Sequence, residues 1–279
     1  PDQLHKQVAV EFLEAGKHVL CEKPLALTKE DINDIVAAAE KSNCKFMVGQ
    51  ICRFTPSFVK TKELIDSGVL GEIYFVESEY AHDYAVARGV DDWRVDPDRH
   101  GIIGGGCHAI DLLRWMMGDE VESVYGSVRN HQHPYIQAED IGVAVVNFKN
   151  GAVATIEGTV NTVESLEETL CVFGENGLVR LGGMNASTVD VWKFKDEVSD
   201  DEYKRDIEEK APNVYGNGHK SLYYNVIEAL KNKTQPYVDL YAGKRALEIV
   251  LAIYKSQLTG EKVNLPLEDF ASSDMENIF

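Results

Sequence analysis

His18-Val19-Leu20-Cys21-Glu22 is a short, mostly apolar run that leads directly into Lys23-Pro24. A helical pattern separates it from a second run of this kind, Lys45-Phe46-Met47-Val48-Gly49. Thr28 stands at the start of that pattern and Asp31 follows three residues later, which is the spacing of a reciprocal helix cap. Apolar residues then recur on one helix face, at Ile32, Ile35, Val36 and Ala39. Nearly all-apolar strands are typical of parallel sheets that helices cover on both sides, so residues 1–51 are predicted to contain a parallel βαβ unit.

A different pattern begins near Pro56 and predicts a second domain over residues 52–279. A long alternating strand is expected over 72–80, and two Asn-Gly pairs, Asn150-Gly151 and Asn176-Gly177, indicate two β-hairpins. Helical patterns cover about 102–117, 219–232 and 241–259. The fold class is therefore α/β, with a partial parallel sheet followed by an α+β domain that has a large, mostly antiparallel open sheet flanked by helices.

Composition and charge exclude several classes of function. The 279 residues are 44% hydrophobic and carry a formal net charge of −18, with no basic run that would bind nucleic acid or an anionic membrane surface. No signal peptide or membrane segment is recognisable, so a cytoplasmic location is predicted. The five cysteines are widely spaced and include no C-x-x-C pair, so reduced thiols and no metal site are expected.

Two side chains are expected at the cleft beyond the carboxyl ends of the parallel strands, where ligands of such sheets bind. The first strand leads into Lys23 and the second leads into Arg53. Pro24 keeps Lys23 out of helical geometry and so sets the direction in which the chain leaves the strand. A surface lysine in an ordinary turn is an equally good interpretation of the Lys-Pro pair.

The segment from Gly104 to Trp115 is the second candidate, because three glycines precede His108 at a helix start. Glycines there would let a ligand approach free backbone N–H groups. His108 and Asp111 share a helix face, although a histidine in this position is more often structural. Asp111 is better suited to orienting a neighbour or capping the helix than to reacting. The bare match Gly104-x-Gly106-x-x-Ala109 to a dinucleotide loop is rejected, because no apolar strand directly precedes it.

Weaker candidates lie in polar loops and at a helix entry. Trp93 and Arg94 would stack on and pair with a ligand, although a Trp that merely covers the surface is about as good an interpretation. His82 follows the long strand, and His219 opens a later helix, where histidines are commonly caps. These residues are predicted only as substrate or cofactor contacts.

Residues 15–26, with Glu22-Lys23-Pro24 at their centre, resemble the Glu-Lys-Pro segment of the Gfo/Idh/MocA oxidoreductases. Three further segments match the family pattern in the same order along the chain: Arg53-Phe54 with Pro56, the glycine-led His-x-x-Asp helix, and residues 252–260. The resemblance implies a Rossmann domain for NAD or NADP whose first half is missing, and an open sheet that forms a homodimer or homotetramer. It also implies a cis Lys23-Pro24 bond. One departure stands out: Gly104 occupies the position where many members carry an aspartate. Because the chain enters a helical pattern directly from Pro1, we also expect that sequence upstream of it has been removed.

The resemblance implies oxidation of a secondary hydroxyl of a sugar, inositol or nucleotide-linked sugar by hydride transfer to NAD(P). His108, titrating near neutrality, is the expected base and Lys23 the expected alkoxide stabiliser. The alternative is a sugar-sensing or regulatory protein without turnover. Predicted cofactor contacts are Glu22, Lys23, Pro24, Arg53, Trp93 and Arg94. Predicted substrate contacts are Lys23, Arg53, His82, His108, Asp111 and His219.

Overall fold

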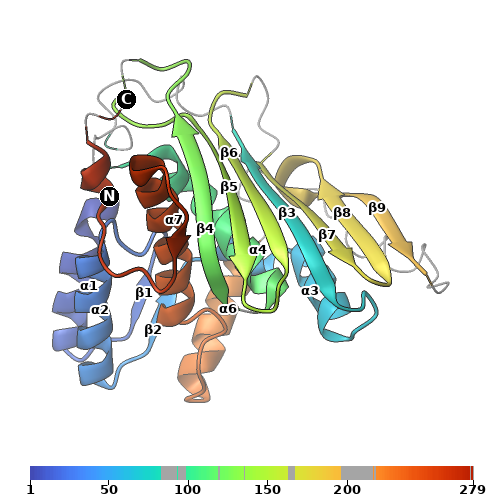
Figure 1. Cartoon of the computed structure of the whole chain (residues 1–279). Helices are drawn as coiled ribbons and strands as arrows, with labels where there is room; N and C mark the ends of the chain where they lie inside the picture. Colours follow the sequence, from blue (N-terminus) through green and yellow to red (C-terminus); the bar gives the residue numbers. More distant parts are fainter. Residues whose placement is uncertain are drawn as a thin grey trace.

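The computed structural model describes residues 1–82, 93, 99–118, 120–134, 136–162, 167–195, 216, 218–276 and 278, and arranges them around two sheets (Figure 1). The smaller sheet pairs β1 (Val19–Cys21) with β2 (Phe46–Val48) in parallel. Helices α1 (His5–Glu14) and α2 (Lys29–Ser42) pack beside it. The predicted βαβ unit is confirmed, with each strand shorter at both ends than the apolar run that predicted it.

The start of α2 shows the Thr28 half of the expected reciprocal cap, while the Asp31 carboxylate pairs with Lys6 at 3.0 Å. Thr28 has extended backbone geometry, and its hydroxyl oxygen accepts a hydrogen bond of 3.0 Å from the Asp31 N–H. Asn43 ends the helix in the left-handed region, at φ 54°. Ile32 and Ile35 are fully buried, so the apolar face found in the sequence is the buried face of the helix.

The larger sheet has eight strands in the order β10-β4-β5-β6-β3-β7-β8-β9. Both Asn-Gly hairpins are confirmed as β5–β6 and β7–β8, and every pair is antiparallel except the central β3–β6 pair. The patterns noted in the sequence did not indicate β4, β9 or β10. The strands are β3 (Ile73–Ala81), β4 (Val121–Arg129), β5 (Ile141–Phe148), β6 (Val153–Thr159), β7 (Glu167–Gly174), β8 (Gly177–Gly182), β9 (Thr188–Phe194) and β10 (Val263–Asn264).

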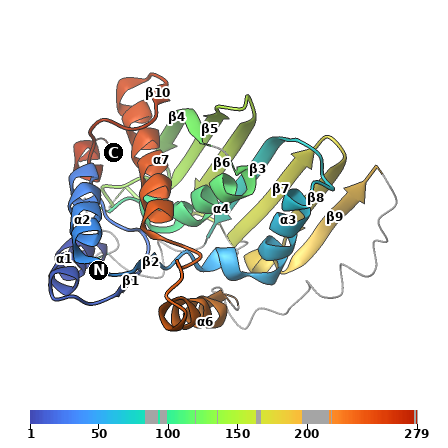
Figure 2. The ribbon, with the colours of Figure 1, turned by 90° about the horizontal axis from the view of Figure 1, so that it is seen from below.

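The helices of the second unit gather on one face of the large sheet (Figure 2). The C-terminal helix α7 packs on β4, and just before it the Val238 carbonyl accepts a hydrogen bond from Val48 of β2, so this segment joins the two units. No helix in the described ranges is long and apolar enough to cross a membrane. The elements are η2 (Ile51–Phe54), α3 (Pro56–Asp66), the π-helix η4 (Ile102–Gly106), α4 (Cys107–Met117), η5 (Met184–Ala186), α6 (Gly218–Lys231), α7 (Leu240–Thr259) and η6 (Ser272–Met275), with η1 (Asp2–Leu4) at the N-terminus.

The two faces of the large sheet differ in burial. Along β5, Ala144, Val146 and Phe148 are buried under the helices, whereas Val143 and Val145 alternate with them on the exposed side. The outer face is thus apolar at several positions and is not covered by any of the helices drawn in Figure 1.

A buried polar network fixes the π-helix η4 against α7. The Glu139 carboxylate accepts hydrogen bonds from the Ile102 N–H at 2.7 Å and from the Tyr254 hydroxyl at 2.8 Å, while the Tyr254 oxygen itself accepts from the Ile103 N–H at 3.0 Å. His100 contacts the other Glu139 oxygen at 2.8 Å. Burial and the neighbouring carboxylate raise the pKa of Tyr254 well above its ordinary value, which keeps the hydroxyl proton available as a donor.

We predict that Tyr254→Phe lowers the free energy of unfolding by about 1–3 kcal/mol, because it leaves the buried Ile103 N–H and one Glu139 oxygen without this partner. Urea denaturation followed by circular dichroism measures the change. Tyr125→Phe, on the exposed face of β4, is the matched control and is expected to be neutral. Equal stability of Tyr254→Phe and wild type would show that the network does not hold η4.

Candidate functional site

The site is built where the small sheet meets the first turn of the glycine-led helix. Lys23 follows β1, and its ammonium donates a hydrogen bond of 2.8 Å to the carbonyl of Gly104 in η4. The Lys23-Pro24 peptide bond is cis, as expected. Glu22 lies beside Gly49 at the ends of the two parallel strands, and the buried Pro24 accepts a hydrogen bond from the His5 ring through its carbonyl.

The glycines before His108 serve a purpose other than the predicted one. They lie inside the π-helix, and side chains occupy the space beside them: a Cβ on Gly104 would collide with the Arg99 guanidinium, and one on Gly105 with the Tyr80 ring. The expectation that they leave room for a ligand was therefore wrong. Rejection of the dinucleotide-loop match is confirmed, because residues 104–106 are helical and do not form a strand-to-helix turn.

His108 is buried in the first turn of α4 and is surrounded by cationic or potentially cationic groups. Burial is the main cause that holds its pKa well below 6.5, and the charges of Lys23, His82 and His219 act in the same direction. The expectation that His108 titrates near neutrality was wrong, since its surroundings favour the neutral ring. Lys23, His82 and His219, which are all predicted site residues, therefore lie close enough to His108 for their charges to affect its ring.

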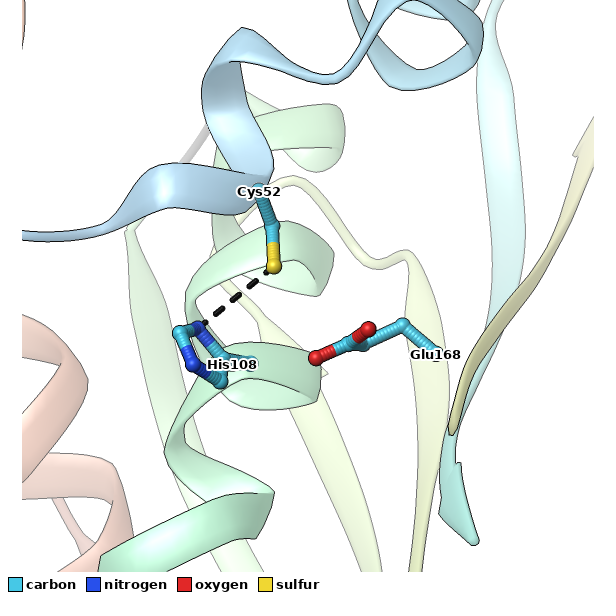
Figure 3. A group of neighbouring side chains, drawn as sticks. All are labelled: Cys52, His108 and Glu168. Atoms are coloured by element: carbon cyan, nitrogen blue, oxygen red, sulfur yellow. Dashed lines mark hydrogen bonds between the residues drawn. The ribbon is translucent and has the colours of Figure 1, made fainter. Parts of the chain in front are cut away.

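Two buried residues beside His108 were missed in the sequence. Cys52 lies in η2 with its sulfur 3.5 Å from His108 Nδ1, and Glu168 reaches the same point from β7 (Figure 3). Burial raises the pKa of the Cys52 thiol well above 9, and a hydrogen bond with Glu168 raises it further, so Cys52 is a neutral thiol. No local pattern unites these residues, because three separate elements bring them together.

Cys52, His108 and Glu168 are also residue types that bind Zn²⁺, and their ligand atoms lie within 4.8 Å of one another. The Lys23 ammonium influences both Cys52 and His108, so a metal ion would share the space with a fixed cation. A hydrogen-bonding contact of 3.5 Å joins Cys52 Sγ to His108 Nδ1, and the Glu168 carboxylate lies beside them (Figure 3). We therefore describe the three residues as a cluster of polar side chains and not as a metal site.

Arg53 and Asp111 form a buried ion pair next to this cluster. Arg53 Nε and Nη2 donate to the two Asp111 oxygens at 2.7 and 2.6 Å, and the guanidinium lies over the Trp115 ring. Burial lowers the pKa of Arg53, but the charge and hydrogen bonds of Asp111 outweigh it and the pKa is raised. Asp111 thus orients a neighbour, as the sequence analysis favoured, and the pair anchors η2 to α4.

The remaining predicted contacts are only partly placed. His82 follows β3 and lies against the Tyr80 ring, with ring centroids 4.7 Å apart. Trp93 is stacked by the Arg99 guanidinium, which also donates to Asp2 at 2.6 Å. Arg94 lies outside the described residues.

We predict that Asp111→Asn destabilises the protein by about 3–5 kcal/mol, because it leaves the Arg53 charge buried without a counter-ion. Asp66→Asn is the matched control: Asp66 pairs with Lys62 on the exposed side of α3, where loss of an ion pair is expected to cost less than about 1 kcal/mol. Chemical denaturation of both variants measures the difference. Similar costs for the two would show that the buried pair is not an anchor.

Two family models match consecutive parts of the chain. Residues 1–50 match the "Oxidoreductase family, NAD-binding Rossmann fold" model, and residues 58–180 match the "GFO/IDH/MocA C-terminal domain" model. The chain covers 56% of the oxidoreductase YrbE of Bacillus subtilis, at 29% identity, and 48% of the levoglucosan dehydrogenase of Pseudarthrobacter phenanthrenivorans, also at 29%. It thus spans about half of the length of these two relatives.

Other relatives match nearly the whole chain. The myo-inositol 2-dehydrogenase of Thermotoga maritima is 28% identical over 95% of this chain and 77% of its own length. The crystal structure of the WlbA dehydrogenase from Bordetella pertussis, in complex with NADH and UDP-GlcNAcA, superposes with a TM-score of 0.86 at 33% identity, covering 96% of this chain and 78% of that one. With both domain models matched in order and a relative this similar along its length, the chain belongs to the Gfo/Idh/MocA oxidoreductase family.

Proposed function

We propose that this protein is an NAD(P)-dependent dehydrogenase that oxidises a secondary hydroxyl of a sugar, inositol or nucleotide-linked sugar. The observation that carries the proposal is the meeting of Lys23 and His108 at one place: Lys23 hydrogen-bonds to the helix turn that leads into His108, and its charge acts on the His108 ring. The names of the relatives support the substrate class, since they include inositol, levoglucosan and UDP-sugar dehydrogenases.

The residues at the ends of β1 and β2 suit the nicotinamide end of such a cofactor. Ligands of parallel α/β sheets bind beyond the carboxyl ends of the strands, and Glu22, Lys23 and Pro24 stand at that position. Bound NAD or NADP would supply the hydride acceptor, so the chain itself has to orient the hydroxyl and accept one proton.

Neutral His108 is the proposed proton acceptor, because its lowered pKa keeps a nitrogen lone pair free at physiological pH. Lys23 would hold the substrate oxygen and stabilise the negative charge that develops as the proton leaves. The aspartate that many family members place near the histidine has no counterpart at Gly104, where the Arg99 guanidinium fills the space. The protein must therefore orient His108 by other means.

Cys52 and Glu168 provide that orientation in our proposal. The Glu168 carboxylate lies beside the Cys52 thiol, and we propose that it accepts the single thiol proton in a hydrogen bond. The sulfur then accepts a hydrogen bond from His108 Nδ1–H at 3.5 Å, which leaves Nε2 as the lone-pair nitrogen. This arrangement fixes the tautomer through a thiol in the way that a buried carboxylate does in other His-dependent enzymes.

We predict that Lys23→Ala and His108→Ala each lower kcat by about 100-fold or more in the full-length protein, the usual loss when a general acid or base is removed. Reduction of NAD and NADP is followed by absorbance with a panel of sugars and polyols.

The acid limb of the wild-type kcat/KM profile is expected below pH 6.5, because His108 accepts a proton in its neutral form and its pKa is lowered.

Lys17→Ala, an exposed lysine after α1, is the control and is expected to retain wild-type turnover. Wild-type turnover in both Lys23→Ala and His108→Ala would remove the assignment. Absence of nicotinamide reduction with every substrate, together with tight sugar binding, would instead identify the sugar-sensing alternative.

We predict that Cys52→Ala lowers kcat by about 10-fold, because loss of a group that orients a catalytic side chain, here His108, typically has an effect of this size. Cys52→Ser retains a donor and an acceptor and is expected to recover most of the activity. The ¹⁵N chemical shifts of the His108 ring report the tautomer directly: protonated Nδ1 in wild type and Cys52→Ser, a mixture in Cys52→Ala and Glu168→Gln. Cys171→Ala, on the face of β7 opposite to Glu168, is the control for loss of a buried thiol. An unchanged His108 tautomer in Cys52→Ala would contradict the proposed role of Cys52.

The open sheet is proposed to form a homodimer or homotetramer in a cytoplasmic protein. Its outer face exposes apolar side chains on neighbouring strands, and contiguous apolar surface of this kind is typical of protein interfaces. The exposed residues are Tyr125 of β4 and Ile141, Val143 and Val145 of β5.

A further inference from the structure

A second hollow lies between α2, α4 and α7, away from the Lys23–His108 site, and it is unusually rich in cations for so acidic a chain. Its volume is about 280 Å³. Two carboxylates, Glu120 and Glu248, lie among five cationic side chains, which gives a net charge of +3 within a protein of net charge −18. The cations are Lys29, Arg114, Lys149, Lys244 and Arg245.

The internal ion pairs do not balance this charge. Glu120 is shared by Arg114 at 3.1 Å and Arg245 at 3.6 Å, and Glu248 pairs with Lys29 at the buried floor. Lys149 and Lys244 form no ion pair with any carboxylate of the described residues. Charge of one sign therefore accumulates in a concave surface, where low-dielectric walls strengthen its field.

The titration behaviour of the cations agrees with this excess. Burial lowers the pKa of Lys29, and the neighbouring Lys244 ammonium lowers it further. For Arg114, burial again lowers the pKa; Glu120 opposes this, but the charges of Arg245 and Arg53 add to the lowering. Cations that destabilise one another in this way gain stability when an anion is placed among them.

We propose that this hollow is a binding site for a compact multivalent anion, of the class of a phosphate or pyrophosphate group carried by a metabolite. Lysine and arginine donors from α2, α4, α7 and the end of β5 surround the space, so one small anion would contact several cations at once. The site is separate from the catalytic cluster: His108 stands in the first turn of α4, and Arg114 lies about 9 Å further along that helix at 1.5 Å per residue. The proposal does not depend on the dehydrogenase activity.

Isothermal titration calorimetry of the chain with inorganic pyrophosphate, at low and at physiological ionic strength, tests the site. We expect saturable binding of one anion per chain that weakens with salt. The double variant Lys244→Ala/Arg245→Ala is expected to weaken this binding by 10-fold or more. Both positions lie on α7 with their side chains at least partly exposed, and alanine favours a helix, so the variant should fold; circular dichroism checks that it does.

The matched control is Lys220→Ala/Lys231→Ala, which removes two positive charges from α6 and is expected to keep the wild-type affinity. Titration with ADP distinguishes the source of the anion. Equal affinity for ADP and pyrophosphate identifies the phosphate groups as the recognised element, whereas tighter binding of ADP identifies a nucleotide. Both results support an anion site. Lack of saturable binding of either probe overturns the proposal. So does equal weakening in the two double variants, because it would mean that only the net charge of the protein matters.

Discussion

The hydrogen bond from the Lys23 ammonium to the Gly104 carbonyl joins the two parts of the molecule that carry the proposed catalytic cluster. It joins the end of a parallel strand to a turn of π-helix in the second unit, across a large separation in sequence. A π-helical turn directs carbonyl groups differently from an α-helix, and such turns are frequent at functional sites. The bond therefore places a fixed positive charge next to the helix start that carries the imidazole.

Burial and that positive charge together set the protonation state of the imidazole. Burial, the Lys23 cation and two further histidines all disfavour the imidazolium form, so the neutral ring is favoured. A neutral ring needs a defined tautomer before it can accept a proton at a chosen nitrogen. The thiol of Cys52, kept protonated by burial and by Glu168, is suited to setting it, and this explains how the cluster can function without a carboxylate at position 104.

Helix α4 connects two electrostatically different regions. Its first turn lies in the cluster, its middle carries Asp111 paired with Arg53, and its last turn carries Arg114 at the edge of the cationic hollow. A negative surface overall would repel anions at long range, so a local positive hollow has to be concave and partly buried to retain them. The two double variants separate that local effect from net charge.

The sequence by itself determined the local architecture. Thr28 and Asp31 marked the helix start, the two Asn-Gly pairs marked the hairpins, and the apolar runs gave the parallel pair, because capping, turn geometry and strand burial act within a few residues. It also singled out Lys23 and His108, through their positions at a strand end and a helix start.

Only the tertiary structure decided how those residues are used. The glycines make room for Arg99 and Tyr80, and Cys52 and Glu168 meet His108 from separate elements. Nor does local sequence determine the pKa of His108, which depends on burial and on charges that the fold brings together. These properties arise from packing between segments far apart in the chain, and no short-range pattern encodes such contacts.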